Sequence, residues 1–128
     1  MRSIVICNNC RFPDGSKTGA DGRTGGQTLI DAMRRVLSVD NRQDVKLVEQ
    51  TCLWNCTQSC SVVFRDRKRY SYVTGRHEPS IQQAEAILQW FDAHGETEKG
   101  EVPFRQWPPA MKGHFIARIP PDEKAGEA

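Results

Sequence analysis

The sequence predicts an α/β (α+β) domain in which two helices cover a small mixed sheet. Three observations predict it: short β-branched runs, two stretches with apolar residues at helical spacing, and the order in which these alternate. Two strands joined through a helix favour a right-handed parallel crossover, and a following hairpin adds antiparallel strands. The predicted element order is therefore β-α-β-β-β-α, followed by an irregular arm.

The first half of the chain contains two predicted strands around one predicted helix. Residues 3–7 (SIVIC) are apolar and β-branched, as in a buried strand. Residues 11–26 contain five glycines and no apolar periodicity, which predicts an irregular loop long enough that a functional reason for it is worth seeking. Residues 27–39 carry apolar side chains at helical spacing, and residues 45–51 alternate as a strand does.

The second half contains a predicted hairpin and a second helix. Residues 61–64 (SVVF) and 70–73 (YSYV) are strand-like runs on either side of a polar turn, which favours a β-hairpin. Residues 80–94 carry a second amphipathic stripe, and a Glu-Pro-Ser sequence marks its start. Gly95 is well placed to end this helix.

Three segments follow from this pattern. Residues 1–95 form the domain that contains the sheet and both helices. Residues 96–121 have aromatic side chains between prolines, and we expect an irregular arm that covers one face of the sheet. Residues 122–128 are polar and follow two prolines, which predicts a disordered tail.

Composition narrows the class of protein. The chain has 128 residues, of which 38% are hydrophobic and 27% charged, as is ordinary for one globular domain. A net charge of +2 gives no support for nucleic-acid binding, and no apolar run is long enough to span a membrane. The first apolar stretch is too short for a secretory signal. We therefore expect a cytoplasmic protein that binds neither nucleic acid nor membranes.

The chain has five cysteines in two groups. Cys7 and Cys10 form CNNC at the end of the first predicted strand, and Cys52, Cys56 and Cys60 form CLWNCTQSC after the second. The carboxyl ends of two neighbouring parallel strands lie together, so the two groups are expected to converge. In a reducing compartment an odd number of clustered thiols favours metal binding over a disulfide framework.

The residues alone do not decide which metal the cysteines would bind. Four thiolates suit either Zn(II) or an iron–sulfur cluster, and the spacing separates the two only weakly. Glycines beside Cys10 would allow backbone N–H groups to approach cluster sulfurs, although a flexible loop explains them equally well. A third alternative is thiol–disulfide chemistry. It is less favoured because a redox CxxC motif normally opens a helix, whereas here the glycine-rich loop intervenes.

A family resemblance appears at the second cysteine group. The segment CLWNCTQSCSVVFRDRKRYSYVTG resembles the signature of thioredoxin-like [2Fe–2S] ferredoxins, and the resemblance spans about residues 3–95. The chain as far as Pro121 also resembles a family of small bacterial proteins labelled predicted metal-binding, which share the CxxC, the CxxxCxxxC and a tail like FRQWPPAMKGHFIARIPP. These resemblances imply a thioredoxin-like fold.

The ferredoxin resemblance also implies a ligand set. Carried over residue by residue, it gives Cys7, Cys52 and Cys56 as cluster ligands, with Cys10 as the fourth. Cys10 is unusually close to Cys7 for the fourth ferredoxin ligand, so Cys60 is the alternative. Cys60 could equally be a small buried hydrophobic residue that begins a strand.

The function implied is electron transfer to an unidentified redox protein, with no catalysis by the chain itself. No arrangement typical of hydrolysis is present, and we interpret His77 as structural. The basic turn at residues 65–69 could dock an acidic partner or be simply solvated. Trp54 could shield the cluster, contact a partner or pack in the core. The sequence leaves open whether the protein is a monomer or a homodimer.

Overall fold

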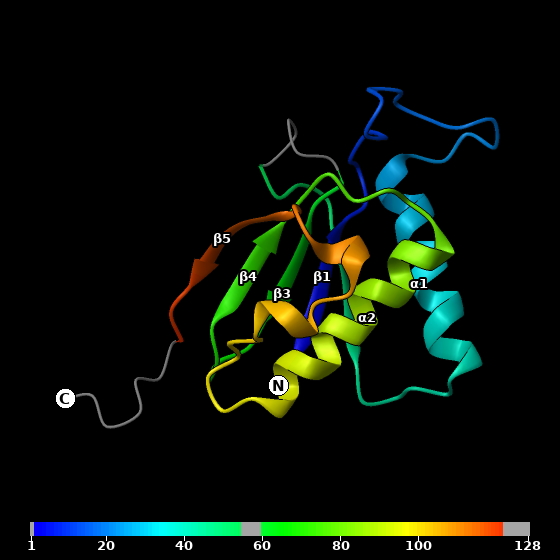
Figure 1. Cartoon of the computed structure of the whole chain (residues 1–128). Coiled ribbons are helices and arrows are strands. Elements are labelled where there is room, and N and C mark those ends of the chain that lie inside the picture. The colour runs from blue at the N-terminus through cyan, green and yellow to red at the C-terminus, as the bar shows by residue number, and fades with distance from the viewer. Residues whose placement is uncertain (1, 55–59, 122–128) are drawn as a thin grey trace.

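The computed structural model describes residues 2–54 and 60–121, and in them it shows one mixed sheet with two α-helices (Figure 1). The order of the elements agrees with the predicted β-α-β-β-β-α pattern. Their bounds are β1 (Ser3–Cys7), α1 (Gly25–Val39), β2 (Lys46–Gln50), β3 (Val62–Arg65), β4 (Ser71–Thr74), α2 (Ile81–Glu96), the 3₁₀ helices η2 (Phe104–Gln106) and η3 (Pro109–Met111), and β5 (Phe115–Ile119).

The sheet has the order β2-β1-β3-β4-β5. β1 and β2 are parallel, as the crossover through α1 predicts, and Cys7 lies opposite Gln50 at their shared carboxyl end. β3 pairs antiparallel with β1, with Ile6 opposite Val62, and β4 follows β3 as the second arm of the predicted hairpin. The start of β3 therefore lies at the same end of the sheet as the ends of β1 and β2.

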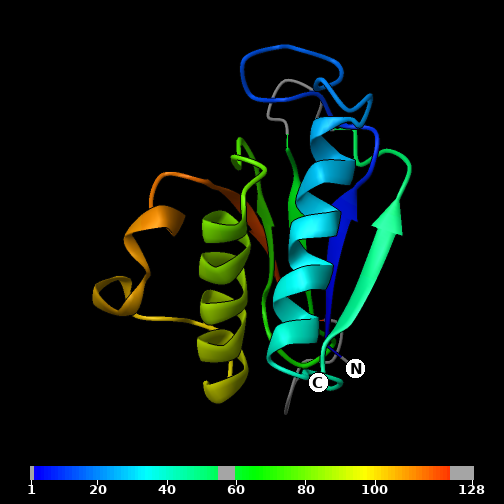
Figure 2. The same ribbon diagram turned by 90° about the vertical axis from the view of Figure 1, so that its right-hand side faces the viewer.

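Both helices lie on the same side of the sheet (Figure 2). On β1 and β3 the residues that point toward them, Ile4, Ile6, Val62 and Phe64, are fully buried, and alternation along each strand sends the next residues to the opposite side. Trp90 of α2 is at the centre of an aromatic cluster, with ring centroids 4.9 Å from both Phe64 and Tyr72. The core therefore lies between the helices and one face of the sheet.

α2 begins directly after Ser80, one of the predicted start signals, whereas α1 begins at Gly25, two residues before the predicted start and within the predicted loop. Thr24 is the N-cap of α1 and accepts a hydrogen bond from the Gln27 N–H, while Ser80 caps α2 in the same way. The prediction that Gly95 ends α2 is wrong, because the helix continues to Glu96. Gly95 has a different reason to be glycine. A Cβ there would lie 2.4 Å from the guanidinium of Arg2, which crosses the helix at this point.

The arm after α2 is more regular than predicted. Residues 104–106 and 109–111 form 3₁₀ helices, and residues 115–119 form β5, which pairs antiparallel with β4 at the edge of the sheet. Trp107 and the buried Met111 of this segment pack against the hydrophobic core. The sequence pattern does not predict β5, because its residues FIARI do not alternate between apolar and polar and most of the strand is exposed. The predicted tail at 122–128 lies outside the described residues.

Buried His94 makes stability depend on pH. Its Nδ1 accepts a hydrogen bond of 3.1 Å from the Arg2 guanidinium, which can only donate, so Nε2 carries the proton and donates to the Tyr70 carbonyl at 2.7 Å. Burial lowers the pKa of His94 below its ordinary value. Below about pH 6.5 the unfolded chain binds a proton at this histidine that the folded chain excludes. Stability is therefore present above that pH and lost as the pH falls.

We expect His94→Gln to weaken this pH dependence. The wild-type free energy of unfolding should fall more steeply than that of the variant once the pH is below the unfolded histidine pKa, by at most about 1.4 kcal/mol per pH unit, the limit for one proton. Urea unfolding of both proteins between pH 7 and pH 5, in the same metal state, measures the two slopes. Equal slopes would show that His94 is protonated to the same degree in the folded and unfolded states.

Candidate metal centre

Two cysteine groups that are distant in sequence meet at one end of the sheet. Cys7 ends β1, and its backbone N–H donates to the Ser61 carbonyl at 3.4 Å, next to Cys60. The Cys7 Sγ lies 3.4 Å from the carbonyl oxygen of Thr51, which precedes Cys52. This convergence is the one predicted from the parallel pairing of β1 and β2.

Cys10 and Cys60 are buried beside Cys7. Burial, with a contribution from the neighbouring Cys7 thiol, raises the pKa of Cys10 to about 11. Burial also raises the pKa of Cys60 to about 12, with contributions from Cys10 and Cys7. The Cys60 Sγ is 3.5 Å from the carbonyl oxygen of Arg11. The structure thus brings together the predicted ligands Cys7 and Cys10 and the alternative ligand Cys60, and all three are buried.

Cys52 lies at the solvent side of this cluster. It is exposed, and its Sγ accepts a hydrogen bond of 3.3 Å from the Trp54 N–H. Trp54 is 93% exposed, which contradicts the alternative that it packs in the core. Its φ of 57° lies in the left-handed region that bulky residues rarely adopt. Cys56, the remaining predicted ligand, lies outside the described residues.

The start of α1 packs directly against the Cys7–Cys10 turn. The Gly26 N–H donates to the Cys10 carbonyl at 3.1 Å, and the Thr24 hydroxyl donates to the Asn8 carbonyl. A Cβ on Gly26 would lie 1.9 Å from the Cys7 carbonyl oxygen, and one on Gly25 would lie 2.7 Å from that of Arg11. The glycines therefore allow a close backbone approach. In the described residues that approach is to the carbonyl groups of Cys7 and Arg11.

The position of the amino end of α1 beside the cysteine turn affects the electrostatics of the site. The amino end of a helix carries a partial positive charge, and α1 has 15 residues. Although a long loop separates Cys10 from α1 in sequence, the loop returns so that the helix begins beside the cysteine turn (Figure 1). The helix end therefore favours negative charge on the sulfurs at this site.

The donor chemistry fits a soft, positively charged metal group. Burial disfavours the ionised form of a thiol. A bound metal cation supplies positive charge that stabilises the thiolate. Within residues 2–54 and 60–121, no three cysteine, histidine or carboxylate side chains are already arranged to hold a metal ion. The described cysteines therefore define where such a group would sit without fixing its coordination.

The thiols should differ in reactivity in metal-free, reduced protein. We expect Cys52 to react with a water-soluble alkylating reagent at least about tenfold faster than Cys10 or Cys60, since reaction requires an exposed thiolate. Mass spectrometry of peptides after timed alkylation at about pH 7.5 measures the three rates. Equal rates for Cys52 and Cys60 would contradict the buried position of Cys60.

A pair of stacked histidines, of which His77 is buried and His114 partly exposed, lies next to the cysteines, and no pattern in the sequence indicates its pairing. His77 accepts at Nδ1 from the Gln83 amide at 2.8 Å and donates from Nε2 to the Thr74 hydroxyl at 2.7 Å. Its ring stacks on His114 at 4.7 Å, and its backbone N–H donates to the Cys60 carbonyl at 3.3 Å. Burial lowers the pKa of His77 to about 3, so the ring is neutral. These contacts support the interpretation of His77 as structural.

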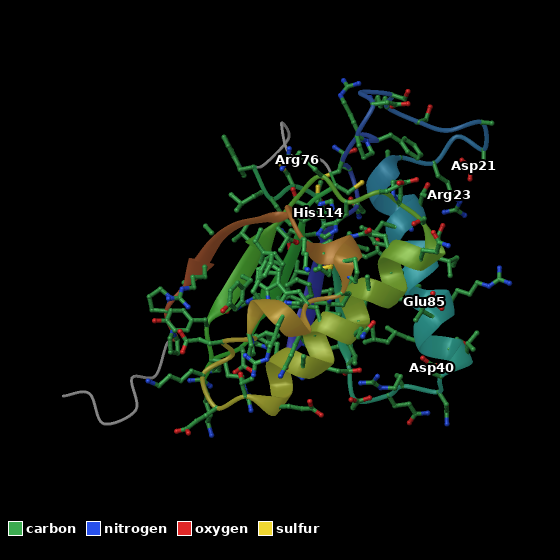
Figure 3. The ribbon with its side chains drawn as sticks, viewed as in Figure 1. Asp21, Arg23, Asp40, Arg76, Glu85 and His114 are labelled. Carbon is green, nitrogen blue, oxygen red and sulfur yellow. The ribbon has the colours of Figure 1, made fainter. Side chains whose placement is uncertain are left out.

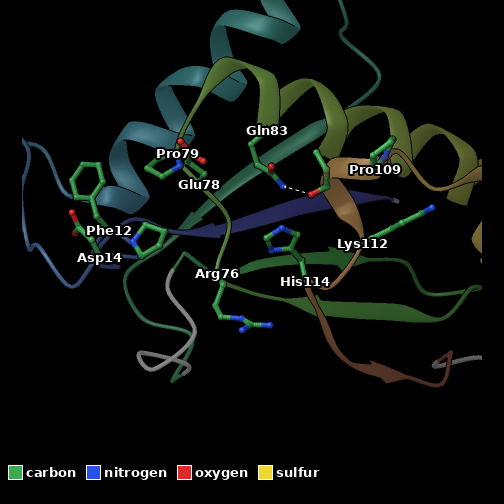
Figure 4. Close-up of a pocket in the computed structure, with 11 residues that line it drawn as sticks. Phe12, Asp14, Arg76, Glu78, Pro79, Gln83, Pro109, Lys112 and His114 are labelled. Carbon is green, nitrogen blue, oxygen red and sulfur yellow. Dashed lines mark hydrogen bonds between the residues drawn. The ribbon is translucent and has the colours of Figure 1, made fainter.

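A cleft of about 580 Å³ opens beside this pair (Figure 4). It lies between the glycine-rich loop, represented by Phe12 and Asp14, and the segment around His114. Arg76, which also lines it, is on the same end of the molecule as the glycine-rich loop (Figure 3). The Arg76 guanidinium donates to the Gly113 carbonyl at 2.9 Å, so the arm after α2 is held in place as one wall of the cleft.

The basic hairpin turn lies at the other end of the sheet. Arg65 is opposite Ser3, at the amino end of β1, whereas the cysteines are at its carboxyl end. Arg69 is structural, because it bonds Asp66 at 3.0 Å and the carbonyls of Thr97 and Gly95. The turn as a whole therefore does not adjoin the cysteines.

Comparison with known proteins identifies the fold. The solved thioredoxin-like [2Fe–2S] ferredoxin from Aquifex aeolicus matches with a TM-score of 0.59 and 16% identity, covering 97% of each chain. Two cysteine-to-serine variants of that ferredoxin match with TM-scores of 0.58 and 0.56 at 14% identity, each covering 91% of this chain and 99% of the other. The fold is thioredoxin-like, as the sequence predicted, and at this identity the likeness establishes the fold alone.

Sequence comparison places the chain in a family. The model of the family described as protein of unknown function DUF1636 matches residues 4–121, and the chain belongs to that family. A comparison with curated proteins finds no significant match. No helix in the described part of the chain is long and apolar enough to cross a membrane.

Proposed function

We propose that the protein is a small cytoplasmic electron carrier that holds a [2Fe–2S] cluster on Cys7, Cys10, Cys52 and Cys56, with Cys60 as the alternative ligand. The observation that carries the proposal is the convergence of both cysteine groups at one end of a thioredoxin-like sheet. When bound, a [2Fe–2S] cluster accepts and donates one electron. Its partner would be another redox protein.

The residues around the cysteines would support this role. Burial of Cys7 and Cys10 excludes water from one side of the site, and the start of α1 favours negative charge there. Cys52 is exposed to solvent, so an electron could leave or enter at this cysteine. His77, which is neutral and fixed by two hydrogen bonds, holds the Cys60 backbone in place.

A zinc site is the second candidate, used for structure, metal delivery or regulation. The observation that favours it is the all-sulfur donor set in a dry environment, which suits Zn(II) as well as iron. Thiol–disulfide exchange is less favoured, because burial raises the pKa values of Cys10 and Cys60 and so reduces the thiolate that such exchange requires.

Metal and sulfide analysis of protein purified without oxygen tests the proposal. We expect about two iron and about two acid-labile sulfide per chain, with the visible absorption of a [2Fe–2S] protein. One zinc per chain in a colourless sample would replace the electron-transfer proposal with the zinc alternative. Protein without metal that changes its free thiol content with redox state would favour thiol–disulfide chemistry.

A further inference from the structure

The side of the sheet opposite the helices presents an apolar surface that reaches the cysteine site. Strand register places one valine from each of four strands on it, and we call this set, Val5, Val48, Val63 and Val73, the valine face. Three of the four remain partly exposed, whereas Ile4, Ile6 and Phe64 on the helix side are completely buried. Both helices lie on the other side of the sheet (Figure 2).

Two adjoining hollows lie on this face, and we call them together the groove. One, of about 260 Å³, is lined by Val5, Val48, Val63 and Cys52. The second, of about 440 Å³, shares Val63 and Arg65 with the first and extends toward the hairpin turn. A partner seated in the groove would therefore contact the exposed cysteine at one end of it.

The charged residues of the groove have one dominant sign. Lys46, Arg65 and Arg67 line it and are exposed. The carboxylate among the described lining residues, Asp66, has a side chain that is only 5% exposed and is already bound by Arg2 at 3.3 Å and Arg69 at 3.0 Å. An apolar floor with a cationic rim is complementary to a protein surface that has apolar side chains surrounded by carboxylates.

We propose that the valine face with its cationic rim is the docking site for an acidic redox protein, which it places beside Cys52. This inference rests on the proposed electron-carrier function and names the kind of partner and the surface it uses. A second copy of the chain that used the same face would fit poorly, since it would bring the same cations into one interface, and the described lining residues offer no exposed carboxylate to pair with them. Trp54, exposed two residues after Cys52, is a further side chain of the type enriched in protein interfaces.

Site-specific cross-linking in the cells that make the protein tests the docking site. A photo-cross-linking amino acid replaces exposed Gln50, which lines the smaller hollow, and in the control it replaces exposed Arg35 on α1, on the other side of the sheet. The captured protein is identified by mass spectrometry. We expect position 50, and not position 35, to capture an acidic protein that carries a redox group.

Charge reversal makes the test specific. In the variant Lys46→Glu with Arg65→Glu, capture at position 50 should fall roughly tenfold, and in the matched Lys46→Gln with Arg65→Gln variant it should fall less. Both positions are exposed, and unchanged metal content and circular dichroism verify that the variants fold.

The remaining outcomes would overturn the docking site. They are no adduct at position 50, an adduct with a second copy of this chain, equal capture at positions 50 and 35, or capture that charge reversal leaves unchanged. Metal and sulfide analysis of the same purified protein separates this failure from that of the electron-carrier proposal. Protein that contains the cluster but gives no adduct refutes the docking site alone, whereas protein without iron refutes the electron carrier.

Discussion

Replacement of Cys7 with serine is expected to lower the iron and sulfide content of anaerobically purified protein by at least about tenfold. Cys7 is buried at the end of β1, its backbone bonds Ser61, and its sulfur lies against the segment that contains Cys52. It therefore joins the two cysteine groups, and a serine hydroxyl is a harder and weaker ligand for iron. Iron and sulfide analysis with visible spectroscopy measures the loss.

The other cysteines supply the controls for this series. We expect Cys10→Ala to lose the cluster as Cys7→Ser does, and Cys60→Ala to retain most of it, because Cys10 is the favoured fourth ligand. The opposite result for this pair would make Cys60 the fourth ligand, which its burial beside Cys7 and Cys10 allows. Full retention of the cluster in Cys7→Ser would refute the ligand assignment as a whole.

The spacing of apolar residues along the chain is sufficient to predict the helices and strands that bury apolar side chains. Residues 3–7 are predicted as a strand, and β1 has these bounds, since every one of its residues is buried. The parallel pairing of β1 with β2 follows from the intervening helix, and with it the meeting of Cys7 with the Cys52 segment. The resemblance at the second cysteine group then selects the thioredoxin-like fold, which the comparison with solved structures confirms.

Features that depend on contacts between distant residues cannot be predicted in this way. Gly95 has the pattern of a helix end, but its role is to leave room for Arg2, from the other end of the domain's sequence. The hydrogen bonds of His77 to Gln83 and its stacking on His114 likewise depend on how α2 and the arm pack. β5 is an exposed edge strand, so burial leaves no alternating pattern in its sequence.

Gly26, the second residue of α1, should be essential for both stability and metal binding. Alanine is the better helix former, by about 1 kcal/mol, so helix propensity alone predicts that Gly26→Ala stabilises the protein. The structure predicts the opposite, because the new Cβ would lie 1.9 Å from the Cys7 carbonyl oxygen and 2.9 Å from its carbonyl carbon. Backbone atoms of a buried strand end cannot move aside as a flexible side chain can, so either α1 or the Cys7–Cys10 turn must shift.

We therefore expect Gly26→Ala to lower the free energy of unfolding by at least about 3 kcal/mol and to reduce the metal content in parallel. Gly22→Ala, in the loop that leads into α1, is the matched control. Gly22 has a φ of +80°, and no atom lies within 4 Å of the place that an alanine methyl group would take. Alanine there should therefore cost only about 1 kcal/mol and leave the cysteines undisturbed. Urea unfolding and metal analysis of both variants measure the effects. If Gly26→Ala were as stable as Gly22→Ala, the close approach of α1 to the cysteine turn would be wrong, and with it the contribution of the helix end to the site.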